Sequence, residues 1–78
     1  PSARTKSRAA LAAARAATDR RARLEVLHRR VDEEFGARTE RLRACFTENS
    51  DTARRQARNL VREMQFLQKL AREVDELE

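Results

Sequence analysis

The stretch ARRQARNLVREMQFLQKLAREV, residues 53–74, decides the fold class of this chain. Its apolar residues recur in alternating steps of four and three, a spacing that places them on one face of a helix. They are Ala53, Ala57, Leu60, Met64, Leu67, Ala71 and Val74. Residues 49–51, Asn-Ser-Asp, precede the stretch and supply turn residues and a side-chain oxygen for capping. The pattern therefore predicts a helix over residues 51–77 that packs through this face, with Phe66, Leu70 and Leu77 forming a second apolar strip beside it.

The middle of the chain predicts a second helix, over residues 20–47, with Asp19 as its N-cap. Its apolar face comprises Leu24, Leu27, Val31, Phe35, Leu42, Cys45 and Phe46. Arg38 falls within this face, so its aliphatic stem is expected to lie along the core while its guanidinium reaches water.

The first segment predicts a third helix, over residues 2–17, with a much weaker apolar face. That face consists of Ala3, Ala10, Leu11, Ala14 and Ala17, so it contains a single large side chain. Residues 1–18 hold four basic and no acidic residues, which accounts for most of the net charge of +5. We expect this helix to be basic and to pack weakly.

Three helices with short connections at residues 18–19 and 48–50 predict an all-α fold, an antiparallel three-helix bundle forming a single interaction domain over residues 1–78. With one Gly, one Pro, no Trp or Tyr and 40% charged residues, the composition argues against extended β-structure. No apolar run approaches the roughly 20 residues that a membrane span requires.

The side-chain inventory argues against an enzyme, a cofactor and a metal site. His28 is the only imidazole, and Cys45 lies 17 positions away on the same predicted helix, about 25 Å along its axis. Glu25 and His28 have the Glu-x-x-His spacing of di-iron bundles, but no further inward carboxylates complete such a site. One cysteine forms no internal disulfide, which favours a reducing, intracellular compartment.

Residues 59–70, NLVREMQFLQKL, resemble the last helix of the C-terminal domain of HscB-type co-chaperones of iron-sulfur cluster assembly. Upstream features occur in the order that the resemblance implies: Arg23-Leu24-Glu25, then Arg30-Val31 with Phe35 four residues on, then Phe46 and an acidic turn ending in Asp51. The similarity covers about residues 8–78.

The resemblance implies a docking module that binds the cluster scaffold protein, IscU, in the bacterial cytoplasm or the mitochondrion. It also implies a separate J-domain that stimulates a DnaK-type ATPase, but His28 is followed by Arg29, so this sequence lacks the His-Pro-Asp tripeptide of a J-domain. Phe66 matches the scaffold-contacting Phe of the family, and Leu70 stands beside it on the same strip.

The first helix departs from the family pattern, because the large apolar and acidic residues that contact the scaffold are missing. Arg8 is the clear match there, Ala9 stands in place of Glu, and Leu11 is the first large apolar residue. We therefore expect Arg8 and Leu11 to form one wall of the scaffold site and Phe66 and Leu70 the other.

Two other interpretations fit the sequence. Sixteen arginines and a basic first helix are compatible with a helical domain that binds nucleic acid or another polyanion. The regular apolar spacing of residues 53–74 is compatible with a self-associating coiled coil, that is, a homo-oligomer.

Overall fold

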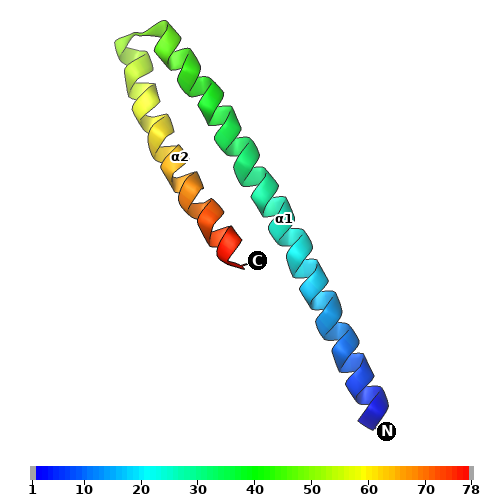
Figure 1. The fold of residues 1–78 in the computed structure, drawn as a ribbon. Coiled ribbons are helices and arrows are strands. Elements are labelled where there is room, and N and C mark those ends of the chain that lie inside the picture. The colour runs from blue at the N-terminus through cyan, green and yellow to red at the C-terminus, as the bar shows by residue number, and fades with distance from the viewer. Residues whose placement is uncertain (1, 78) are drawn as a thin grey trace.

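The chain folds into two antiparallel helices, α1 (Ser2–Glu48) and α2 (Asp51–Leu77), which form a hairpin (Figure 1). The computed structural model describes the backbone of residues 2–77 and the side chains of residues 7–77. The hairpin is a rod of 73 × 15 × 13 Å, whose length is set by α1. Neither helix, within the described residues, is long and apolar enough to cross a membrane.

The turn between the helices consists of Asn49 and Ser50, within the predicted connection at residues 48–50. Asn49 adopts a φ of 51°, and its backbone N–H donates to the Cys45 carbonyl over 3.0 Å, which ends α1. The Ser50 hydroxyl oxygen accepts from the backbone N–H of Ala53 over 3.0 Å. Ser50 is therefore the N-cap of α2, and α2 has the predicted bounds.

The core is a single seam between the two helices. On α2 the buried residues are Ala53, Leu60 and Val74. On α1 they are Leu24, Val31 and Cys45. The α1 residues are separated by multiples of seven, and the α2 residues by seven and fourteen, which is the repeat of a coiled-coil interface. The α2 face predicted from residues 53–74 is confirmed.

The predicted apolar face of residues 20–47 is wider than the seam that α1 buries. Leu27 is 45% exposed and Phe46 is 70% exposed, so their assignment to the buried face was wrong. In a pair of helices each member covers only a narrow line of the other, and side chains that flank this line stay in contact with water. A broader stripe would need a third helix to bury it.

The predicted break at residues 18–19 is wrong, because α1 runs through it without interruption. Neither Thr18 nor Asp19 breaks a helix as Pro would, and each costs at most about 0.7 kcal/mol relative to Ala. The Thr18 hydroxyl donates to the Ala14 carbonyl over 2.9 Å, so it is used inside the helix. The predicted helices 2–17 and 20–47 are one helix, and the structure does not confirm a three-helix bundle.

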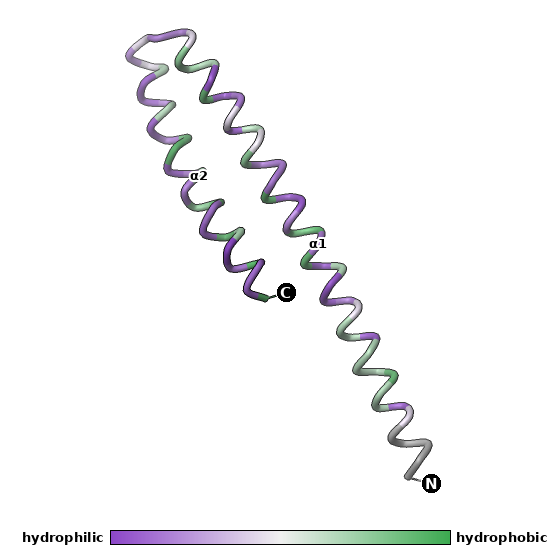
Figure 2. Tube along the Cα trace, in the orientation of Figure 1, coloured by the Kyte–Doolittle hydropathy of each residue, from purple (hydrophilic) through white to green (hydrophobic). Residues whose placement is uncertain are grey.

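The N-terminal part of α1 extends beyond the end of α2. Asp75, near the C-terminal end of α2, lies 3.5 Å from the His28 imidazole, and α1 continues from there toward Ser2 with no helix beside it (Figure 1). We call residues 2–21 the overhang. Much of it is apolar because of its alanines, as the green segments in Figure 2 show, and Leu11 within it is 54% exposed.

Candidate docking surface

The two predicted anchors on α2 are accessible. Phe66 is 64% exposed and Leu70 is half-buried. They are four residues apart on a helix, so their side chains point in directions that differ by only about 40°. Leu77, which is 66% exposed, lies on the same strip two turns further along.

An ion pair between the helices fixes the side of the hairpin on which this strip lies. The Arg38 Nε–H of α1 donates to Glu63 Oε2 of α2 over 2.8 Å. On α2, Leu70 follows Glu63 by seven residues, and on α1, Leu27 precedes Arg38 by eleven. At 100° per residue each spacing leaves the two side chains within about 20° of the same direction around the helix. Leu27 and Leu70 therefore lie on the same side of the hairpin as the ion pair.

The exposed and half-buried apolar residues on this side form a surface to which both helices contribute. We call it the Arg38-side patch, and it consists of Leu27, Phe66, Leu70 and Leu77. A shallow hollow of about 410 Å³, lined by Ala22, Arg23, Val26 and Leu27, extends it along α1. Sequence reasoning missed Leu27 as a surface residue, because the spacing of residues within α1 does not show how α1 is rotated against α2.

The charged groups at the edge of this patch are paired with one another. Arg38 donates to Glu34 as well as to Glu63, and these hydrogen bonds raise the pKa of the Arg38 guanidinium. The hydrogen bond from Arg38, with its positive charge and that of Arg30, lowers the pKa of the Glu34 carboxyl. The Arg38 side chain is only 23% exposed, in agreement with the prediction that its stem lies along the core. What the patch offers a partner is mainly apolar surface.

The other two predicted site residues lie elsewhere. Arg8 and Leu11 are both exposed on the overhang. Glu63 and Arg38 are level with each other in the hairpin, so Leu11 and Phe66 are separated by roughly 35 Å along the rod at 1.5 Å per residue. A single chain does not bring the two predicted walls of the scaffold site together.

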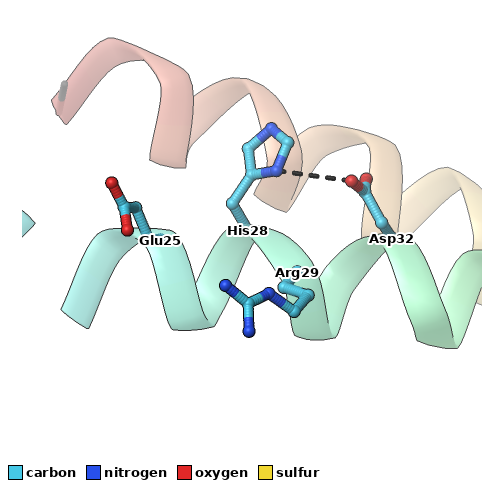
Figure 3. Close-up of a pocket in the computed structure, with 4 residues that line it drawn as sticks. All are labelled: Glu25, His28, Arg29 and Asp32. Atoms are coloured by element: carbon cyan, nitrogen blue, oxygen red, sulfur yellow. Dashed lines mark ion pairs between the residues drawn. The ribbon is translucent and has the colours of Figure 1, made fainter. Parts of the chain in front are cut away.

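A polar hollow surrounds the only histidine. It is lined by Glu25, His28, Arg29 and Asp32 of α1. Figure 3 shows the imidazole turned toward Asp32, with His28 Nδ1 3.3 Å from an Asp32 oxygen. The His28 Nε2 atom lies 3.5 Å from Asp75, so one ring nitrogen faces a carboxylate of α1 and the other a carboxylate of α2.

Metal-binding and nucleophilic groups do not converge in the part of the chain that the structure describes. No group of three or more His, Cys, Asp or Glu side chains is arranged to hold a metal ion there. Cys45 is a buried free thiol whose Sγ lies 3.9 Å from the Gln56 side-chain oxygen.

Comparison with known families gives one match. The model of the family described as the HSCB C-terminal oligomerisation domain matches residues 6–75. No curated protein and no solved structure matches this chain. The match includes most of both helices of the hairpin, most of the overhang and three of the four residues of the Arg38-side patch, Leu27, Phe66 and Leu70.

Proposed function

Because this chain belongs to the HSCB C-terminal oligomerisation-domain family, we propose that it is the non-catalytic docking module of an HscB-type co-chaperone. Its partner is an IscU-like scaffold protein of iron-sulfur cluster assembly, and its compartment is the bacterial cytoplasm or the mitochondrion. A DnaK-type chaperone is a partner only through a J-domain, whose His-Pro-Asp tripeptide is not in this sequence.

The observation that supports scaffold binding most directly is the exposure of Phe66. An aromatic side chain that is 64% exposed, on a strip with Leu70 and Leu77, leaves apolar surface in water unless a partner covers it. Aromatic residues, phenylalanine included, are enriched in the cores of protein interfaces. On this proposal Phe66 and Leu70 enter an apolar groove of the scaffold, and Leu27 contacts the rim.

Arg8 and Leu11 belong to the proposal as a second, separate contact. They lie on the overhang, roughly 35 Å from Phe66 by the rise of the helix. A scaffold that contacts both sets must extend along the rod, and a smaller one contacts only the Arg38-side patch. Binding that is insensitive to Leu11→Ala but sensitive to Phe66→Ala would indicate the smaller footprint.

The test is titration of the chain with an IscU-like scaffold protein by calorimetry. Phe66→Ala is expected to cost about 2 kcal/mol or more in binding free energy, which is roughly a 30-fold loss of affinity. Because Phe66 contributes little to the seam, the far-ultraviolet circular dichroism spectrum should not change.

Phe46→Ala is the matched control for this titration. Phe46 is 70% exposed, like Phe66, but lies near the turn at the end of α1. The proposal predicts that the scaffold affinity of this variant equals that of the unsubstituted chain. If Phe66→Ala and Phe46→Ala leave the affinity equally unchanged, the Arg38-side patch is not the scaffold site.

Self-association is a second candidate function, supported by the family description as an oligomerisation domain and by the continuation of the α1 seam. Ala17 and Ala10 precede Leu24 by seven and fourteen residues, so they continue the seam of α1 into the overhang, where no second helix covers it. Sedimentation equilibrium should then give a mass above 9.0 kDa that increases with concentration, and Ala10→Glu should lower it. A mass of 9.0 kDa at every concentration would exclude self-association.

A further inference from the structure

A second exposed apolar site lies near the turn of the hairpin. It is a surface hollow of about 630 Å³, lined by Phe46 of α1 and by Arg54, Ala57, Arg58, Val61 and Arg62 of α2. Phe46 is 70% exposed and Val61 is 40% exposed. We call it the Phe46 hollow.

The Phe46 hollow and the Arg38-side patch lie on opposite sides of the hairpin. Phe46 follows His28 by 18 residues, which is five full turns, so it lies on the side marked by the contact between His28 and Asp75. On α2, Val61 and Phe66 are five residues apart and point in directions that differ by about 140°. A partner in the hollow would therefore leave Phe66 accessible.

Arginines line the hollow along α2. Arg54, Arg58 and Arg62 recur every four residues, so they form a row on one face of the helix. Arg54 is paired with Asp51 over 2.9 Å, whereas Arg58 and Arg62 form no ion pair among the described residues. Two guanidinium groups beside an apolar floor are thus free to pair with a partner.

The positive charge is local to this end of α2. Residues 51–62 hold four arginines and one aspartate, whereas residues 63–77 hold four acidic and two basic residues. A ligand that carries negative charge is attracted to the hollow and not to the other half of the same helix.

We propose that the Phe46 hollow docks an acidic amphipathic helix of a partner protein. An apolar side chain of that helix would contact Phe46 and Val61, and acidic residues four positions apart would pair with Arg58 and Arg62. A helix is favoured over an extended strand because the described rod has only helices, whose backbone groups are already paired, so a strand would find no edge to complete its hydrogen bonds.

The apolar floor is what distinguishes this partner from a nucleic acid. Phosphates would pair with the arginines, but they would gain nothing from Ala57 and Val61. A single phenylalanine is also a poor platform for successive bases, which need several aromatic side chains. The hollow therefore offers both arginines and an apolar floor, and a helix with one acidic edge and one apolar face can contact both.

The probe is a synthetic helical peptide with glutamates four residues apart and leucines on the adjoining face, measured by fluorescence anisotropy with the full chain. Binding is expected at low salt. Val61→Asp should weaken it at least about tenfold, since it places a carboxylate on the floor of the hollow. Phe46→Ser, at a position that is 70% exposed, should weaken it as well without unfolding the chain.

Charge reversal makes the test specific. Arg58→Glu combined with Arg62→Glu should abolish binding of the glutamate peptide and create binding of a matched peptide with lysines in place of the glutamates. Arg41→Glu makes one substitution of the same kind, with half that change of charge, on exposed α1 surface outside the hollow and should leave the affinity unchanged.

Two results would overturn the proposal. One is no binding of the glutamate peptide to the unsubstituted chain at low salt. The other is a peptide affinity that Val61→Asp and Phe46→Ser do not lower, together with an equal affinity for single-stranded DNA of the same charge. That outcome would identify a surface for polyanions only. Neither result bears on the scaffold titration with Phe66→Ala, because that residue lies on the opposite side of the rod.

Discussion

Leu60→Ala is expected to lower the free energy of unfolding by about 2–5 kcal/mol, the range for large-to-small changes in a packed core. Leu60 is 3% exposed and packs with Cys45 and Ala53, with Leu42 and Ala57 at the edge of the cluster. A two-helix hairpin has no second layer that could close over the cavity. Because small domains have a narrow margin of stability, much of the variant should be unfolded at room temperature. Urea denaturation followed by circular dichroism measures the loss.

Leu11→Ala is the matched control, since it removes the same atoms from the same kind of residue in a helix. Leu11 is 54% exposed on the overhang, with no helix beside it, so the change in unfolding free energy should stay within about 0.5 kcal/mol. Equal losses for Leu11→Ala and Leu60→Ala would contradict the two-helix structure. They would show that the overhang is packed in a core of its own, as the predicted three-helix bundle required.

The part of the fold that could be predicted from the sequence is the part in which local and tertiary signals agree. In α2 the alternating spacing from Ala53 to Val74, the cap at Ser50 and the turn at Asn49 all indicate the same helix, and its bounds match those predicted. When capping, periodicity and burial are consistent, a sequence specifies one local structure.

The overhang could not be predicted because the local signals there are weak. Thr18 and Asp19 resemble a helix boundary by residue type, but the cost of keeping them inside a helix is small next to the high helix propensity of the alanines on either side. Whether residues 2–17 fold back depends on apolar area, and one leucine among small side chains supplies little of it. The choice between two and three helices is therefore made by tertiary packing.

The candidate site shows the same division. The strip of Phe66, Leu70 and Leu77 followed from helical spacing alone, because residues three, four and seven apart share a side of a helix. The contribution of Leu27 to the patch did not follow from helical spacing, since it depends on how α1 is rotated against α2. The Arg38–Glu63 ion pair fixes that rotation, and no spacing within one helix reveals it.

A second large effect is expected from Val31→Asp. Val31 is 6% exposed in the middle of the α1 seam, about level with Ala71 of α2 by the register of the two ion pairs that join the helices. The substitution loses the burial of the Val side chain, about 1.5–3 kcal/mol, and also places a carboxylate where water is largely excluded. At neutral pH the variant should be mostly unfolded, as measured by circular dichroism and by its midpoint in urea.

Val31→Asn separates the effect of charge from the effect of shape, because Asn and Asp are nearly the same size. Burial raises the pKa of the Asp carboxyl in the folded state above its unfolded value of about 3.9. At pH 7 the free energy of unfolding of the Val31→Asp variant should therefore be lower than that of Val31→Asn by about 1.4 kcal/mol per unit of that rise. As the pH falls through the raised folded pKa the carboxyl is protonated and this gap shrinks, and it vanishes below the unfolded pKa. Glu34 gives the chain a pH dependence of the opposite sign, because its lowered pKa means that its stabilising contribution is lost in acid. This loss is common to both variants and cancels in the difference between them. A gap between Asp and Asn that is absent at pH 7, or that does not change between pH 7 and acid, would show that Val31 does not face the seam.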